Sequence, residues 1–593
     1  MRLHLLFFLL VFGAQSSAQT IPPALSTDWS NAGYPDSFPN PSLIFDITNF
    51  GGNGNGVFDN ANALNNALDS LHGSQGVIYF PTGNYFIGST IDLPDSVIIR
   101  GLSSDSTHLI FNLNGTVGNG FNITGSASGT FASVLSLAIR GSTEIVVDDP
   151  SSFSTGDYCE LVQNNGTWDT QPVSWADNSV GQILHLTNIS GDTLLFDSPL
   201  RINYDTALNP RIQKLNPGRE VGIECIQLSR ADSVHAGVCI NIYFNYAINC
   251  WVKGVESSKS IGSHFEMDAS SNITITGCYV HHNFEYDGTS THGYGITTFG
   301  HSGQCLISNN IMKHLRHSFS FQAGANGNVL SYNYSIDPNR SEAPSNFGAD
   351  ISMHGHYPFS NLFEGNIVQN LQIDQTWGPS GPYNTFFRNR AELYGILMTS
   401  GTVQSDSLNF VGNEVTNTTP FFGNYALAGS AHFEFGNNIK GTITPTGTTN
   451  LPDSSYYLTG LPAFWSGSLF PSIGLPNTIN TGSIPARDRY LSGVNLTVCN
   501  EEIINRVAKL TKNNIEIFPN PATNQIRIKG INGSIGSVIT LKDLNGKNIS
   551  IDKLLVDSNE ATINIAQTIK SGIYLIEIFQ ENMLYVKKLV VIK

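Results

Sequence analysis

The fold is decided by Phe363-Glu364-Gly365-Asn366-Ile367-Val368 and by its near copy Phe386-Phe387-Arg388-Asn389-Arg390-Ala391. In both stretches an asparagine stands three positions after one apolar residue and two positions before another. An arrangement that recurs along a chain is typical of repeat architectures, in which each repeat is one structural unit. The asparagine position therefore serves as a reference column for the rest of the sequence.

Eight positions between residues 240 and 440 share this column, at spacings of 23 to 33 residues. They are Cys250, Cys278, Asn310, Asn333, Asn366, Asn389, Asn413 and Asn438. The residue three positions before is apolar in every case, and the residue two positions after is apolar except at Ser335 and Lys440. Columns of inward apolar residues, with asparagines stacked about 4.8 Å apart, are what a right-handed parallel β-helix requires. The sequence thus predicts an all-β fold.

The composition excludes several other classes of protein. The chain has 593 residues, of which only 13% are charged and 10% are aromatic, and a formal net charge of −16. Intrinsic disorder needs low hydrophobicity with high net charge, and a coiled coil needs a heptad period. Nucleic-acid binding leaves a basic footprint that this acidic chain lacks.

The first residues read as a secretory signal peptide, residues 1–18. Arg2 precedes a short apolar run from Leu5 to Phe12, and Ser16-Ser17-Ala18 offers small residues for cleavage. No later stretch is long and apolar enough to span a bilayer, so no transmembrane segment is expected in the mature chain. The seven cysteines show neither a CxxC pair nor a zinc spacing, and most are expected to be small buried residues.

The C-terminal segment 513–593 differs in charge from the rest. It holds 9 basic and 7 acidic residues, which leaves 21 basic and 39 acidic residues elsewhere, a net of −18. Short runs that alternate apolar and polar residues, with a hairpin turn at Asn545-Gly546, predict a small antiparallel β-sandwich.

Four motifs in this segment resemble the type A C-terminal sorting domain of the Bacteroidota type IX secretion system. They are Phe518-Pro519-Asn520-Pro521-Ala522, Leu544-Asn545-Gly546-Lys547, Ser571-Gly572-Ile573-Tyr574 and Lys587-Lys588-Leu589-Val590-Val591. The resemblance implies that the type IX secretion machinery is a partner and that the segment is an export address. The protein is then secreted or attached to the outer-membrane surface after processing. A carbohydrate-binding sandwich is the alternative.

A second resemblance concerns the start of the repeat region. Its motifs are Phe45 to Gly54, the amphipathic stretch Ala61 to Leu71, Gly76 to Tyr85, and Val97 to Gly101. They look like the entry of the pectate-lyase superfamily, in the branch of rhamnogalacturonases, epimerases and phage tailspikes. Asn55 and Asn60 stand where that family commonly has acidic residues.

The expected organisation is a β-helix over residues 40–490, a linker over 491–512 and the sorting domain over 513–593. The β-helix is interrupted by a β-rich excursion at about 141–212, and a segment at about 441–490 is expected to cover its end. Two tryptophans of the excursion, Trp168 and Trp175, are expected to belong to its core, and exposed rings that stack on sugar faces are the alternative. The chain is expected to be a monomer.

Candidate functional residues cluster where histidine is concentrated, because nine of the 15 histidines fall between His264 and His356. Binding and catalytic residues often lie in long loops that a rigid stack holds in position. The candidate catalytic residues are Arg316, His317, His354, Arg388 and Arg390. The candidate substrate-binding residues are His281, His282, His292, Lys313, His314, His356, Asp374 and Trp377.

Three functions compete for these residues, all of them involving a polysaccharide. A lyase that cleaves an acidic glycan by β-elimination needs a guanidinium for the uronate carboxylate and a base such as histidine. A glycoside hydrolase needs two carboxylates, and no adjacent Asp-Asp pair occurs among the candidates, Asp287, Asp350, Glu364 and Asp374. A non-catalytic glycan adhesin needs neither. The lyase is favoured, although a body with a net charge of −18 argues mildly against a polyanionic substrate.

Metal ligands are harder to predict. His281, His282, Asp287 and His292 form only a loose spacing, so no metal site is predicted. A cation such as Ca²⁺ that bridges the protein and an acidic substrate remains an open alternative.

Overall fold

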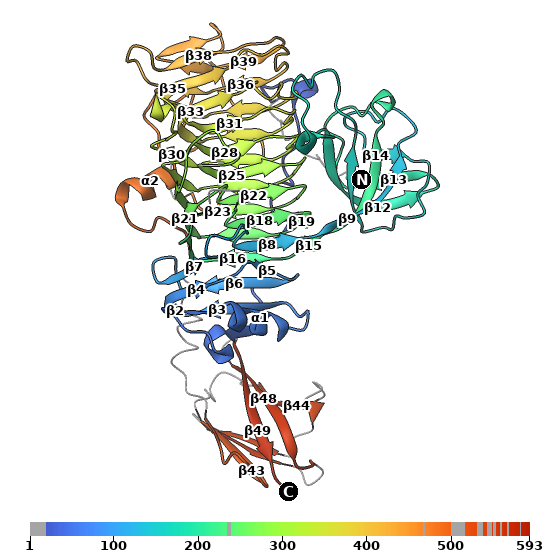
Figure 1. The fold of residues 1–593 in the computed structure, drawn as a ribbon, viewed down its shortest axis with the longest axis vertical. Coiled ribbons are helices and arrows are strands. Elements are labelled where there is room, and N and C mark those ends of the chain that lie inside the picture. Colours follow the sequence, from blue (N-terminus) through green and yellow to red (C-terminus); the bar gives the residue numbers. More distant parts are fainter. Residues whose placement is uncertain are drawn as a thin grey trace, which may run out of the picture.

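The structure, a computed structural model, describes residues 19–233, 239–465, 469–499, 516–529, 538–542, 548–549, 553–557, 560–565, 569–580 and 583–593. The signal peptide 1–18, part of the linker (500–512) and the Asn545-Gly546 turn lie outside the described residues. Figure 1 shows a long stack of parallel strands with a smaller β unit at its side. The all-β prediction, a parallel β-helix followed by a small antiparallel β-sandwich, is confirmed.

Three parallel ladders form the faces of the stack. The first ladder is β1 (Ile44–Asp46), β3 (Gly76–Phe80), β6 (Val97–Gly101), β16 (Gly222–Glu224), β20 (Trp251–Lys253), β23 (Thr274–Thr276), β26 (Leu306–Ser308), β29 (Val329–Ser331), β32 (Leu362–Glu364), β34 (Thr385–Phe387), β36 (Asn409–Val411) and β39 (Phe433–Phe435). The second ladder is β2 (Asn55–Asp59), β4 (Gly83–Ile87), β7 (Thr107–Phe111), β17 (Gln227–Arg230), β21 (Glu256–Ser260), β24 (Tyr279–Asn283), β27 (Ile311–Lys313), β30 (Tyr334–Ile336), β33 (Ile367–Ile373), β35 (Arg390–Met398), β37 (Glu414–Val415) and β40 (Asn437–Ile439). Each strand pairs with the strand one coil away, so a side chain stands about 4.8 Å from its equivalent.

The third ladder carries the groove described below. Its strands are β5 (Ile91–Asp92), β8 (Phe121–Thr124), β18 (Ile242–Asn245), β22 (Phe265–Asp268), β25 (Tyr294–Phe299), β28 (His317–Phe321), β31 (Ala349–Met353) and β38 (Asn424–Ala426). The long strands β33 and β35 belong to both the second and the third ladder. β41 (Thr442–Thr444) closes the stack by pairing antiparallel with β40.

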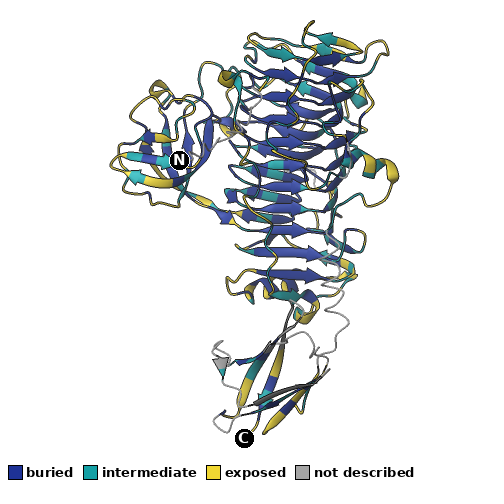
Figure 2. Ribbon diagram, turned by 180° about the vertical axis from the view of Figure 1, so that it is seen from behind, coloured by how far each residue is buried: buried dark blue, intermediate teal, exposed yellow. Residues whose placement is uncertain are grey.

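A hydrophobic core runs through the interior of the coils, as the dark strands in Figure 2 show. Phe363, Phe386 and Phe410 stack within it at ring distances of 4.7 and 5.0 Å. Helix α1 (Ala61–Asp69) packs Leu64 and Leu68 onto the same core at the first coils. Capping in this way protects strands that would otherwise invite edge-to-edge association.

The asparagine column exists and its members are hydrogen-bonded in sequence. They are Asn310, Asn333, Asn366, Asn389, Asn413 and Asn437, and each side-chain amide donates to the next side-chain oxygen at 2.9–3.1 Å. Asn437 rather than Asn438 is the last member, because Asn438 pairs with Glu414. At the other end Ile275 pairs with Val252, so Val255 rather than Cys250 stands in register with Cys278. A second ladder at another corner joins Asn328, Asn361 and Asn384.

The β-rich excursion is one antiparallel sheet that leaves the stack after β8 and returns before β16. Its strands are β9 (Ser126–Ser133), β10 (Glu144–Val146), β11 (Tyr158–Val162), β12 (Gly181–Ser190), β13 (Thr193–Phe196) and β14 (Arg211–Asn216). It begins earlier than the expected residue 141, since β9 pairs with β14. Gly125 lies against Asn216 and Pro217, so the chain leaves and re-enters the stack at neighbouring points.

A segment that we call the strap, residues 445–465 and 469–499, runs back along the outside of the stack. It includes helix α2 (Pro485–Ser492), and Arg489 donates to the carbonyl oxygen of Asn309 at 2.7 Å. Cys499 forms a disulfide with Cys225. Residues 491–499 therefore belong to the strap, whereas the sequence had indicated a linker. The other five cysteines are free and buried, as expected.

The C-terminal segment forms two four-stranded antiparallel sheets. One holds β42 (Glu516–Phe518), β43 (Gln525–Lys529), β46 (Lys553–Asp557) and β47 (Glu560–Asn564). The other holds β44 (Val538–Lys542), β45 (Asn548–Ile549), β48 (Gly572–Gln580) and β49 (Met583–Val591). Ile526, Ile563 and Ile576 are buried in the core between the sheets. Across the described part of the whole chain, no helix has the length and apolar character to cross a membrane.

Candidate active site

An elongated cavity of about 760 Å³ lies along the third ladder. Its floor consists of outward-facing side chains of the strands, among them Tyr243 and Glu266, and one of its rims is the loop between β24 and β25. Trp175 of the excursion lines it as well. The cavity is therefore shared by the stack and the excursion, and we call it the groove.

Four polar side chains lie close together, and three of them line the groove. Arg316 lies with its guanidinium carbon 4.8 Å from the ring centre of Tyr294. The Tyr294 ring is 4.7 Å from that of His317, and the His317 ring is 5.2 Å from that of His354. Three residues predicted from the sequence, Arg316, His317 and His354, are thus brought together. Arg316 and His354 line the groove, whereas His317 does not.

His354 is paired with a carboxylate that the sequence analysis also selected. Its Nδ1 lies 3.0 Å from Oδ2 of Asp374, and both side chains line the groove. Burial raises the pKa of Asp374, but hydrogen bonds from His354 and Thr376 outweigh it and hold that pKa well below the ordinary value. Asp374 lies at ion-pair distance from Nδ1, so Nε2 is the ring nitrogen that a ligand in the groove would approach.

Arg316 and Tyr294 can both donate hydrogen bonds into the groove. Arg316 donates through Nε to the carbonyl oxygen of His292 and through Nη2 to that of Ser290, each at 2.8 Å. A guanidinium has five N–H groups, so three remain beyond these two hydrogen bonds. Burial raises the pKa of Tyr294 to about 12, so its phenol keeps its proton at neutral pH.

Aromatic rings close one end of the groove. Trp377 lines it directly, and the ring of buried His356 is 6.1 Å from the ring of Trp377. Trp175 is 45% exposed, which is at odds with its expected place in the excursion core. Trp168, in contrast, is partly buried and packs against that core.

Four of the predicted substrate-binding residues lie on the second ladder and do not line the groove. They are His281, His282, Lys313 and His314. His281 contacts Glu256 at 3.2 Å, His282 stacks on His314 at 4.8 Å, and His314 contacts Asp337 at 2.8 Å. His281 and Lys313 share one column of the ladder and His282 and His314 the next, and both columns belong to a face next to the groove.

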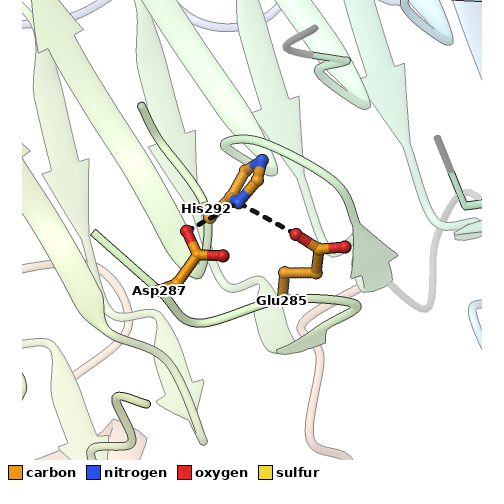
Figure 3. Close-up of side chains that lie close together, drawn as sticks. All are labelled: Glu285, Asp287 and His292. Carbon is orange, nitrogen blue, oxygen red and sulfur yellow. Dashed lines mark hydrogen bonds and ion pairs between the residues drawn. The ribbon is translucent and has the colours of Figure 1, made fainter. Parts of the chain in front are cut away.

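His292 is buried under the rim of the groove between two carboxylates. Figure 3 shows Glu285 and Asp287 directed toward its ring, with Nδ1 at 3.2 and 3.0 Å from their oxygens. One imidazole with two carboxylates is a donor set that Zn²⁺ or Mn²⁺ accepts more readily than Ca²⁺, which prefers oxygen ligands alone. A protonated imidazole between two carboxylates has the same geometry, so we assign no metal to these residues.

Arg388 and Arg390 are placed away from the groove and hold the strap. Arg388 donates to the carbonyl oxygens of Ile473 and Leu475, both at 2.7 Å. Arg390 pairs with Glu414 at 2.7 Å, and both side chains are fully buried. Arg388 donates to backbone oxygens of the strap, and Arg390 is fully buried beside Glu414 and donates to Gly482, so we replace the expected catalytic role of both residues by a structural one.

Most groove residues were not selected from the sequence as candidate site residues, among them Tyr294, Glu266 and Trp175. Pairing across coils brings Tyr294 and Glu266 to one surface, and Trp175 reaches it from the excursion. Burial raises the pKa of Glu266 to about 7, although a hydrogen bond from Ser263 opposes the shift. The signal that the sequence did hold is the alternation of apolar and acidic residues in β22, Phe265-Glu266-Met267-Asp268.

His264, from the same histidine-rich region, is a core residue and makes the chain sensitive to acid. Its Nδ1 contacts Ser257 Oγ at 2.8 Å and its Nε2 contacts Asn283 Oδ1 at 3.0 Å. Burial, reinforced by the neighbouring His281, lowers the pKa of His264 to about 3. The unfolded chain takes up a proton below about pH 6.5 that the folded chain does not, so this stability is present at neutral pH and lost in acid.

We expect the free energy of unfolding of the wild type, relative to His264→Gln, to fall by about 1.4 kcal/mol per pH unit between pH 6 and pH 4. Urea unfolding of both proteins over this range measures the difference. The other titrating groups are the same in both proteins, so their contributions to the pH dependence cancel in the difference. A difference that does not change with pH would contradict the assignment.

Comparisons with known proteins agree with this architecture. Residues 516–593 match the family described as a secretion system C-terminal sorting domain, and residues 44–150 match the family described as rhamnogalacturonase A/epimerase, pectate lyase-like. No curated protein matches the sequence significantly.

Several solved structures are similar at low identity. The tailspike protein of Pseudomonas phage LKA1 is 16% identical, with 63% of this chain and 64% of the tailspike covered and a TM-score of 0.46. The A-module of a mannuronan C-5 epimerase from Azotobacter vinelandii is 12% identical, with 66% of this chain and 98% of the module covered and a TM-score of 0.33. The catalytic unit of an α-1,3-glucanase from Streptomyces thermodiastaticus is 12% identical, with 69% and 67% covered and a TM-score of 0.38. This chain spans about two thirds of the tailspike's length.

The sorting domain marks the chain for secretion or for attachment to the cell surface. The chain thus carries a secretion system C-terminal sorting domain behind a parallel β-helix whose first coils match the pectate lyase-like family.

Proposed function

We propose that the protein is an exported enzyme that cleaves an acidic polysaccharide by β-elimination in the groove. The observation that supports this most is the convergence of Arg316, Tyr294 and His354, a guanidinium, a protonated phenol and an imidazole held by a carboxylate. The match of residues 44–150 to a pectate lyase-like family is consistent with a polysaccharide substrate. Each of the three groups has one task in the reaction.

In the proposed reaction Arg316 binds the uronate carboxylate through its remaining N–H groups and thereby acidifies the proton on C5 of the sugar. His354, oriented by Asp374, removes that proton through Nε2. The electron pair of the C5–H bond forms the C4–C5 double bond, and the bond from C4 to the glycosidic oxygen breaks. Tyr294 protonates the departing oxygen. The products are an unsaturated uronate end and a new hydroxyl on the preceding sugar.

Glycoside hydrolysis is the second candidate, and the raised pKa of Glu266 favours it, because a carboxylic acid that is protonated near pH 7 can serve as a general acid. The neighbouring carboxylate on the same face of β22, Asp268, accepts hydrogen bonds from Tyr243 and Asn245 and does not line the groove, which leaves Asp374 as the partner. Glu266 is four ladder steps from Gln372, close to Asp374 in the sequence, which corresponds to about 19 Å at 4.8 Å per step. Hydrolases hold their two carboxylates about 5 to 9.5 Å apart.

The test is incubation of the full exported chain with polygalacturonate and with alginate, followed by ultraviolet absorbance and a reducing-end assay. Unsaturated product in step with new reducing ends supports the lyase. Reducing ends without new absorbance would establish the hydrolase instead. Polymer binding with neither product would leave a non-catalytic adhesin.

A further inference from the structure

The excursion places an exposed tryptophan beside the groove. Trp175 lies in the short turn η3 (Ser174–Ala176), and 45% of it is exposed. Exposing so much of a large aromatic side chain gives up stabilisation that burial would provide. The other exposed large apolar residues of the excursion, such as Leu135 and Ile139, do not line the groove.

Trp175 meets aromatic rings that belong to the stack. Its ring is 5.7 Å from that of Trp377 at an angle of 71° and 4.8 Å from that of His356 at 84°. Phe299 adds a ring at 5.8 Å. Trp175 and Trp377 both line the groove, so two indole rings at an angle form a corner at one of its ends.

The turn that carries Trp175 is fixed within the excursion. Asn165 donates to the carbonyl oxygen of Ala176 at 2.9 Å and accepts from the backbone N–H of Ser179 at 3.0 Å. Asn165 also donates to a carboxylate oxygen of Asp169 at 2.7 Å. The indole ring is therefore held in place before any ligand arrives, which reduces the entropy lost on binding.

The excursion in turn is fixed to the stack by buried polar contacts. Glu160 of β11 contacts His301 at 2.7 Å, and Arg201 contacts Asn326 at 2.7 Å. Asn326 also donates to the carbonyl oxygen of Gly181 at 3.0 Å. The excursion thus stands as a rigid wall of the groove.

We propose that Trp175 and Trp377 form a sugar-stacking subsite that binds a unit of the polymer away from the cleaved bond. The face of a sugar ring carries C–H groups that pack on an indole ring, while its hydroxyls stay at the edge and can remain hydrated. The proposal rests on the proposed function in that the groove binds a glycan. It assigns to the excursion the task of holding long chains rather than of performing chemistry.

The test compares Trp175→Ala and Trp377→Ala with wild type for binding of polygalacturonate and alginate by calorimetry, whether or not these polymers are cleaved. We expect the dissociation constant of the polymer that binds to rise about tenfold in both variants. Binding of the corresponding disaccharide is expected to change less than twofold. Trp168→Ala is the matched control, because that ring packs on Tyr357 at 4.8 Å and does not line the groove.

Trp175→Phe keeps an aromatic face and should recover most of the affinity, which a merely structural role in folding would not predict. Equal polymer affinity in wild type and Trp175→Ala would overturn the subsite even if cleavage proceeds. Binding that depends on Trp175 without any unsaturated product would support the subsite and overturn the lyase. No binding of either polymer would overturn both.

Discussion

Replacing His354 by glutamine is expected to lower the rate of unsaturated-product formation by about 10²- to 10⁴-fold, which is the usual contribution of a general base. The substitution keeps a hydrogen-bonding side chain of similar size next to Asp374, but it removes the nitrogen that accepts the C5 proton. Initial rates at saturating polymer, from the growth of ultraviolet absorbance, measure the loss.

The control for this variant is His185→Gln. His185 pairs with Asp197 at 2.9 Å, so the same type of contact is removed at a place on the excursion outside the groove. We expect its rate to equal that of the wild type. Comparable rates for His354→Gln and the wild type would remove His354 from the reaction.

Replacing Arg390 by methionine is expected to lower the free energy of unfolding by about 3–5 kcal/mol, as for other buried ion pairs that lose one partner. The change leaves the carboxylate of Glu414 buried without its counter-charge. The same carboxylate accepts from the backbone N–H groups of Gly474 and Asn480 in the strap, and Arg390 itself donates to the carbonyl oxygen of Gly482. Urea unfolding measures the loss.

Arg219→Met is the matched control for this second variant. Arg219 lies 3.8 Å from Asp95 and both side chains are more than half exposed, so its removal is expected to cost about 0–1 kcal/mol. Equal losses for Arg219→Met and Arg390→Met would show that the strap contacts are not more important than a surface pair.

The fold could be predicted because each coil repeats the same order of apolar residues and asparagine. A coil needs apolar residues inside and a polar side chain that bonds to the equivalent side chain of the next coil. The apolar columns meet the first demand, and Asn310 to Asn413 meet the second. The predicted register was wrong where two residues of similar type could occupy the same column. Cys250 and Val255 are both small and apolar, so either could stand above Cys278, and only the pairing of Val252 with Ile275 separates them.

The candidate site could be predicted only in part. His354 was found because a polar residue in an insertion on a stack usually faces solvent or a ligand, and Arg316 because a lyase needs a guanidinium for the uronate carboxylate. Arg388 looks the same in the sequence, yet the oxygens around it come from residues more than sixty positions away. Trp175 reaches the groove from an insertion whose orientation no local pattern specifies.

The closeness of Gly125 and Pro217 has a consequence for how such a protein changes over time. An insertion that begins and ends at one point adds a wall without altering the register of the coils before or after it. A lineage can therefore exchange the whole unit for another of different shape and keep the same scaffold, export signal and reactive groups. Chain-length preference and chemistry can then evolve as separate traits on one molecule.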